Sequence, residues 1–131
     1  IVSGRQYINV PIGDILPRLQ GKVDYGDGRK ADKSPHVMKF WADNASFPYK
    51  SHDLWFVTEN KRWGVMPSSV DSQALVKKVN RADIWREAAK MIGTAAPASD
   101  SRGIEKFFDG KSFDPANPDA YLTSLSIKKL A

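Results

Sequence analysis

Apolar residues recur at helical spacing in several stretches of this chain. The first stretch lies between Pro11, which suits the first turn of a helix, and Gly21, which suits its end. Its apolar residues fall at the i, i+3, i+4, i+7 spacing of one helix face: Ile12, Ile15, Leu16 and Leu19. We expect a helix here, shortened or kinked by Pro17. A second, short helix is expected from Ser34 to Trp41, because Ser-Pro is a good start signal.

The clearest helical patterns lie in the second half of the chain. Ser51 is expected to cap a helix that extends to Arg62. Asp71 begins a segment with Leu75, Val76 and Val79 on one side. Asn80 precedes the strongest pattern, whose apolar residues repeat at helical spacing up to Gly93: Ile84, Trp85, Ala88, Ala89 and Ile92. A last helix is expected from Asn117-Pro118, with inward residues Tyr121, Leu122 and Leu125.

Polar stretches rich in Gly and Pro separate these helices. Residues 22–33 and 109–118 are expected to be irregular, and only Gln6 to Val10 or Val23 to Tyr25 suggests a short strand. No internal repeat is present. The pattern predicts a mainly α chain of several short helices joined by Gly/Pro-rich loops. We expect residues 1–131 to form a single helical segment.

Composition narrows the classes of function. The 131 residues contain no Cys, which excludes disulfides, thiolate zinc sites and cysteine nucleophiles. The net charge of +5 suits an anionic partner, but Lys and Arg are interleaved with carboxylates instead of forming one basic stripe. A basic helical module for nucleic acid is therefore the least favoured reading. No apolar run approaches the roughly 20 residues that cross a bilayer.

Several short motifs resemble catalytic or ligand-binding signatures without meeting their geometry. Residues 51–53 read Ser-His-Asp, but consecutive helical residues point about 100° apart and cannot relay a proton. Gly110-Lys111-Ser112 resembles the end of a phosphate-binding loop, yet Glu105 occupies the position that requires Gly. His36 and His52 have no metal-ligand spacing. We expect no catalytic residue, metal or cofactor, and core packing for the aromatic residues Trp41, Trp55, Trp63 and Trp85.

Longer strings of the sequence carry a family resemblance. They are Ser34-Pro35-His36-Val37-Met38-Lys39-Phe40-Trp41, Ser51-His52-Asp53-Leu54-Trp55-Phe56 with Arg62-Trp63-Gly64, Val79-Asn80-Arg81 through Trp85-Arg86-Glu87-Ala88-Ala89, Ser101-Arg102-Gly103, Phe107-Phe108-Asp109-Gly110, and Phe113-Asp114-Pro115 through Asn117-Pro118 to Ala120-Tyr121-Leu122. In this order they resemble the C-terminal part of the periplasmic nitrate-binding and bicarbonate-binding proteins of bacterial ABC transporters. The resemblance covers nearly the whole chain.

The resemblance implies a fragment of a two-lobed α/β protein that closes over a small oxyanion and delivers it to a membrane permease. The N-terminal lobes are absent here, and the family's anion site is expected upstream, so its ligand residues are unknown in this numbering. This segment is expected to play a structural role, in the periplasm or tethered to the outer face of the cytoplasmic membrane. Should the segment itself bind the anion, Lys50, His52 and Arg62 are the first candidates.

The resemblance also bears on the context and the partners of this segment. A similar domain occurs fused to the C-terminus of the ATPase subunit in some of these transporters, where it senses substrate. The strings do not show whether the parent protein is a binding protein or an ATPase subunit, and they do not show whether the anion is nitrate or bicarbonate. The implied partners are the remainder of the protein, the permease and a small inorganic anion. The isolated segment is expected to self-associate, because its helices carry aromatic residues on more than one side.

Overall fold

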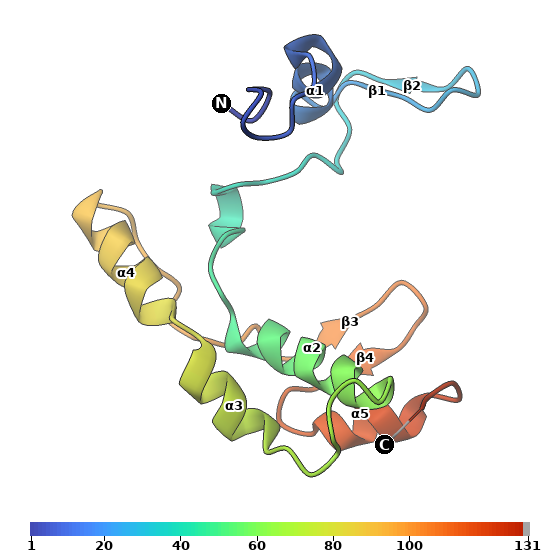
Figure 1. Ribbon diagram of the computed structural model, residues 1–131, viewed down its shortest axis with the longest axis vertical. Helices are drawn as coiled ribbons and strands as arrows, with labels where there is room; N and C mark the ends of the chain where they lie inside the picture. The colour runs from blue at the N-terminus through green and yellow to red at the C-terminus, as the bar shows by residue number, and fades with distance from the viewer. Residues whose placement is uncertain (130–131) are drawn as a thin grey trace. The chain divides into compact units, whose positions relative to one another are not determined.

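The computed structural model describes residues 1–129, which divide between two compact units, residues 1–45 and residues 46–129. Both units consist of short helices and one two-stranded hairpin each, joined by turns (Figure 1). This arrangement confirms the predicted mainly helical class. None of the described helices is long and apolar enough to cross a membrane.

The first unit contains α1 (Ile12–Leu19), β1 (Val23–Asp24), β2 (Lys30–Ala31) and the 3₁₀ helix η1 (Ala42–Asn44). The helix predicted after Pro11 is confirmed. Gly21 follows it with φ of 84°, and a Cβ there would lie 3.2 Å from the Ser34 nitrogen, so both the backbone angle and the space favour Gly. One of the two candidate strands is confirmed, since β1 pairs antiparallel with β2 inside the stretch predicted to be irregular.

The short helix predicted from Ser34 to Trp41 is wrong, because these residues have no regular structure. The Ser34 hydroxyl does accept a hydrogen bond from the His36 backbone N–H, at 3.2 Å, but no helix follows this turn. Met38 and Phe40 are largely exposed. An eight-residue helix without tertiary packing is marginal in water, and the start signal alone does not sustain it.

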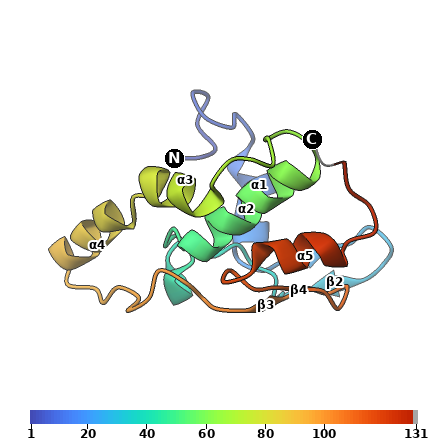
Figure 2. The ribbon, with the colours of Figure 1, turned by 90° about the horizontal axis from the view of Figure 1, so that it is seen from below.

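The second unit is built around α2 (Lys50–Arg62). It also contains α3 (Ser72–Val79), α4 (Ala82–Met91), β3 (Glu105–Lys106), β4 (Ser112–Phe113) and α5 (Pro118–Ser124). Figures 1 and 2 show α5 and the β3–β4 hairpin along one side of α2, while α3 packs on another side and α4 extends beyond it. β4 lies within the stretch 109–118 that was expected to be irregular.

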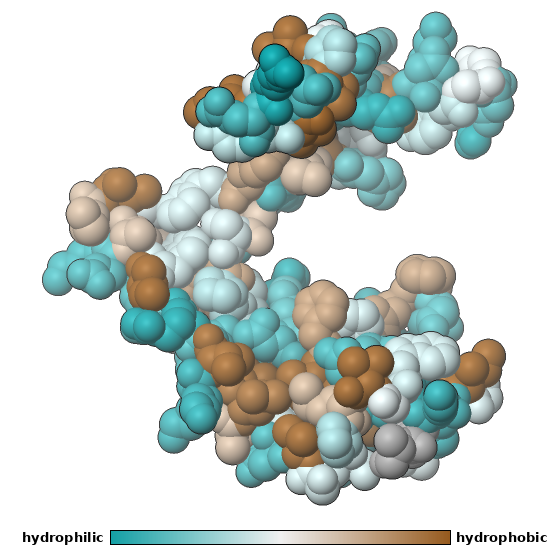
Figure 3. All heavy atoms as spheres, viewed as in Figure 1, coloured by the Kyte–Doolittle hydropathy of each residue, from teal (hydrophilic) through white to brown (hydrophobic). Residues whose placement is uncertain are grey.

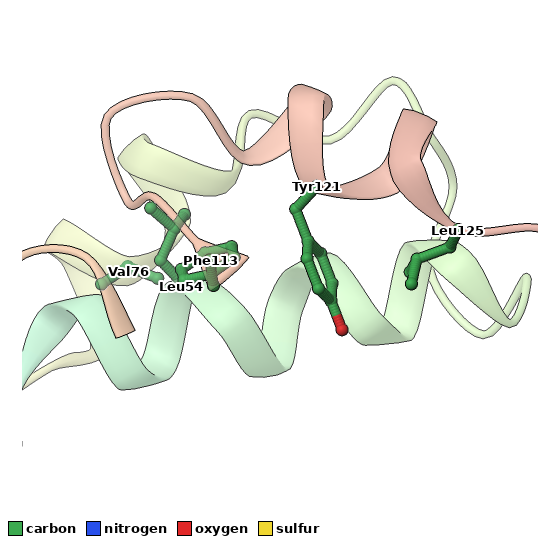
Figure 4. Close-up of a cluster of buried hydrophobic side chains, with 5 residues drawn as sticks. All are labelled: Leu54, Val76, Phe113, Tyr121 and Leu125. Carbon is green, nitrogen blue, oxygen red and sulfur yellow. The ribbon is translucent and has the colours of Figure 1, made fainter. Parts of the chain in front are cut away.

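One hydrophobic core holds α2, α3, β4 and α5 together. Its buried members come from these four elements and the residue after α5 (Figure 4): Leu54, Val76, Phe113, Tyr121 and Leu125. Phe113 is 1% exposed, and its ring meets that of Tyr121 edge-on at 5.5 Å between centroids. The inward positions predicted for Tyr121 and Leu125 are confirmed. The core therefore lies where the C-terminal helix crosses α2.

The helix starts predicted at Asp71 and Asn117 are confirmed, while the cap predicted at Ser51 is wrong. Asp71 accepts a hydrogen bond from the Ala74 N–H at the start of α3, and Asn117 does the same for Ala120 at the start of α5. Ser51 does not cap α2, which begins at Lys50. The Ser51 hydroxyl is turned inward instead and accepts from the Arg102 N–H at 3.2 Å.

The predicted burial of α4 and of the Trp residues needs correction. The helix itself is confirmed, but only Ala82 and Ala89 of α4 are buried, while most of its predicted apolar face is exposed. None of the four Trp residues is fully buried. Trp55 and Trp85 are half-buried, and Trp41 and Trp63 are more exposed. Trp55 packs against the edge of the core, whose buried positions are held by Leu54, Val76, Phe113, Tyr121 and Leu125.

Candidate functional site

Charged and polar side chains of the second unit cluster around the N-terminal end of α2. Asp100 lies at the centre of one cluster, where it pairs with Lys50 Nζ and with an Arg86 Nη atom, both at 2.6 Å. The Lys50 backbone N–H also donates to the Asp100 carbonyl at 2.8 Å, and Arg86 donates to the Pro97 carbonyl. This cluster ties the connector after α4 to the start of α2. Lys50 is thus already engaged in an ion pair.

The Asp100 cluster predicts a specific pH dependence. Lys50, and then Arg86, hold the pKa of Asp100 below its usual value. A carboxyl group with a lowered folded-state pKa stabilises the fold above its unfolded pKa, and this contribution is lost as pH falls through the folded pKa. The loss in unfolding free energy caused by Asp100→Asn should therefore shrink between about pH 6 and about pH 2. Urea unfolding across that range measures it, and a loss independent of pH would contradict this role.

A second cluster borders a pocket of about 330 Å³ between α2 and the β3–β4 hairpin. Its walls are aromatic and come from both elements: Trp55, Phe56, Phe107 and Phe113. At its polar edge Glu105 forms an ion pair with Arg102, 3.0 Å from its Nε atom, and lies 3.3 Å from His52 Nε2. The carboxylate offsets the charge of Arg102 at this edge.

The Ser-His-Asp string is not a catalytic unit in the structure. Ser51 accepts from Arg102, His52 contacts Glu105, and Asp53 accepts from the Asn80 side-chain amide at 2.7 Å. The three side chains reach three different partners, as their positions on one helix predict. They fasten α2 to the segments around it.

Arg62 lies at the other end of α2, about 18 Å along the helix from Lys50 at 1.5 Å per residue. Its guanidinium pairs with Glu59 at 3.1 Å and donates to the Ile127 carbonyl at 2.9 Å. The Tyr121 hydroxyl donates to the same Glu59 at 2.8 Å, and burial together with Glu59 raises the pKa of Tyr121. The three candidate residues Lys50, His52 and Arg62 are therefore not brought together.

The remaining motifs serve turns and caps. The backbone carbonyl of Lys111, in the Gly-Lys-Ser string, accepts a hydrogen bond from the Phe107 N–H and closes the hairpin turn. The Lys111 Nζ atom donates to the Ser124 carbonyl. Asp109 and Asp114 each accept from the backbone N–H two residues on, as expected for turn residues. Within residues 1–129 no three His, Cys, Asp or Glu residues form a group that could hold a metal ion.

The contacts of Lys50 with Asp100 and of His52 with Glu105 could not be predicted from the sequence, because they join distant positions. Lys50 and Asp100 lie 50 residues apart, and His52 and Glu105 lie 53 apart. Opposite charges at such separations carry no spacing signal, unlike pairs within one helix. The local pair of Glu59 and Arg62, three residues apart on α2, has a spacing that a helical prediction could have found.

Nearly the whole chain is similar to bacterial binding proteins for small oxyanions. The nitrate/nitrite binding protein NrtA of Synechococcus elongatus is 58% identical over 99% of this chain, which covers 30% of that protein. The bicarbonate-binding protein CmpA of the same species is 41% identical over 98% of the chain, which covers 31% of it. The nitrate import ATP-binding protein NrtC of that species is 32% identical over 98% of the chain, which covers 19% of it.

A solved structure agrees with these relatives. The crystal structure of the periplasmic nitrate-binding protein NrtA from Synechocystis PCC 6803 matches with a TM-score of 0.86 and 53% identity, over 96% of this chain and 34% of that one. No protein-family model matches. The resemblance to the C-terminal portion of the periplasmic nitrate/bicarbonate-binding protein family is thereby confirmed, and the chain spans about a third of the length of the binding proteins it matches.

Proposed function

We propose that this chain is the C-terminal part of the solute-binding component of an ABC transporter that takes up nitrate or nitrite. The observation that carries the proposal is the higher identity to a nitrate/nitrite binding protein than to a bicarbonate-binding protein over nearly the same residues. We place the protein in the periplasm, or tethered to the outer face of the cytoplasmic membrane, with the permease and the remainder of the binding protein as partners.

Within that protein, this segment serves as a scaffold and not as the anion site or a catalyst. Its best candidate cations are engaged: Lys50 with Asp100, Arg62 with Glu59, and Arg102 with Glu105. A clamp that closes over a small anion needs donors that converge from both jaws. The anion site is therefore expected in the residues that precede this segment in the parent protein.

The choice of anion is tested by titration calorimetry on the full-length parent protein. We expect nitrate and nitrite to bind at least about tenfold more tightly than bicarbonate, which is about 1.4 kcal/mol. Chloride serves as the control for non-specific charge. Preferred binding of bicarbonate would reverse the assignment of the anion, and failure of all three oxyanions would overturn the proposed function.

A second candidate is a substrate-sensing regulatory domain at the C-terminus of the transporter ATPase. The similarity to the nitrate import ATP-binding protein supports it, but the identity is much lower than that to the binding protein. The parent gene separates the two, because an ATPase carries a phosphate-binding loop in a nucleotide-binding fold upstream. A basic nucleic-acid module is a weaker reading still, since it requires steeply salt-dependent binding.

A further inference from the structure

Helix α4 presents three distinct faces. The inward face carries Ala82 and Ala89, which are buried. Asp83, Glu87 and Lys90 project about 100° away from it and form a charged flank, given 100° of rotation per residue. Next around the helix lies an outward apolar stripe that we define by four exposed residues, three on α4 and one directly after its end: Ile84, Ala88, Met91 and Ile92.

The outward stripe is exposed in the described chain. Ile84, Ile92 and Met91 are 52%, 67% and 82% exposed. Figure 3 shows apolar atoms gathered at the end of α4 that extends away from the core of the second unit. A helix that lies free in water needs only one apolar face, toward its own core. The stripe is a second apolar face on the same helix.

The helix is nevertheless held firmly in place. Arg86 reaches from α4 to Asp100 and to the Pro97 carbonyl, and its guanidinium lies 4.9 Å from the Phe47 ring centroid. Asn80 accepts from the Ala82 N–H at the start of the helix. Polar contacts thus fix α4 from its inward side, and the outward stripe is presented in a set orientation.

We propose that the outward stripe of α4 docks on the part of the parent protein that precedes this segment. This inference rests on the proposed function, and it names the surface through which the segment acts as a scaffold. Two observations favour this occupant over a separate partner. Binding proteins that match the chain are about three times its length, and the corresponding part of one such longer protein has the same fold in its crystal structure. An apolar face is also typical of surfaces buried permanently rather than transiently.

The docking is tested by hydrogen exchange on the unmodified full-length parent and on this chain alone. Docking predicts that the α4 amides exchange at least tenfold more slowly in the parent, while the α2 amides, which lie in the core of the segment, change much less. Equal exchange of α4 in both proteins would overturn the proposal. Because this comparison needs no substitution, it does not depend on the folding of a variant.

A matched pair of variants identifies the face. Ile84→Lys and Met91→Lys in the parent should accelerate α4 exchange at least tenfold, whereas Glu87→Lys on the charged flank should leave it unchanged. In this chain alone, all three variants should unfold at the same urea concentration. Equal effects of Ile84→Lys and Glu87→Lys in the parent would overturn the stripe as the docking face. Destabilisation of the chain alone by Ile84→Lys would instead show that the chain itself covers the stripe.

The parent's mass by light scattering distinguishes a second copy as the occupant. A parent that is a dimer, and that Ile84→Lys converts to a monomer, would replace the proposed occupant with another copy of the chain. Nitrate titration separates this inference from the proposed function. If the parent binds no oxyanion but its α4 amides are protected from exchange, the docking of α4 is supported and the proposed function is wrong.

Discussion

Phe113→Ala should lower the unfolding free energy of this chain by about 3 to 5 kcal/mol, the usual cost of truncating a buried Phe. Phe113 is 1% exposed and lies between Leu54 of α2 and Tyr121 of α5. Its removal leaves a cavity among Leu54, Val76 and Tyr121, which the surrounding side chains can fill only in part. Urea unfolding followed by circular dichroism measures the change.

Phe108 provides a matched control on the same hairpin. It is fully exposed, so Phe108→Ala should change the unfolding free energy by less than about 0.5 kcal/mol. Similar losses for the two variants would show that the hairpin, and not the core, determines the stability. A loss below about 1 kcal/mol for Phe113→Ala would place the core elsewhere.

Glu59→Ala is expected to have the next largest effect, a loss of about 2 to 3 kcal/mol. Its carboxylate accepts hydrogen bonds from Arg62, Trp63 and Tyr121, and the side chains of Glu59 and Arg62 are only 16% and 18% exposed. Removal leaves the Tyr121 hydroxyl without its acceptor, and the partly buried Arg62 guanidinium loses its carboxylate partner while it keeps its bond to the Ile127 carbonyl. Burial is what makes such a loss costly.

Asp83→Ala is the control for Glu59→Ala. It breaks the ion pair of Arg81 with Asp83 on α4, in which both side chains are more than 60% exposed. Solvent and salt screen such a pair, so this variant should unfold at nearly the urea concentration of the unmodified chain. Equal losses for Glu59→Ala and Asp83→Ala would mean that the Glu59 network contributes no more than a surface ion pair.

Local signals in the sequence predicted the helices well because those signals act within a few residues. Pro11, Asp71 and Asn117 each mark the start of a helix that the structure contains. The same reasoning failed for Ser34 to Trp41, where a start signal had no packing to support it. It also failed for Ser51, whose hydroxyl is used by Arg102, more than 50 residues away.

Burial and the candidate site could not be predicted in the same way. Helical spacing identified an apolar face on α4 but not whether this chain covers it, and Ile84 and Ile92 are exposed. The partners of Lys50 and His52 lie in the connector and the hairpin that follow α4, which become neighbours of α2 only after folding. The strings that resemble binding proteins carried more information on function than any single motif.

We propose that this segment is a scaffold in an oxyanion-binding protein whose anion site lies outside these residues. Titration of nitrate into the full-length parent and into this chain alone, under the same conditions, tests it most directly. Circular dichroism confirms that the chain alone is folded, and light scattering reports its expected self-association. We predict saturable binding by the parent and none by the chain. Nitrate binding by a folded, monomeric chain at micromolar strength would contradict the account and place the site within these residues, with Lys50, His52 and Arg62 as the first positions to substitute.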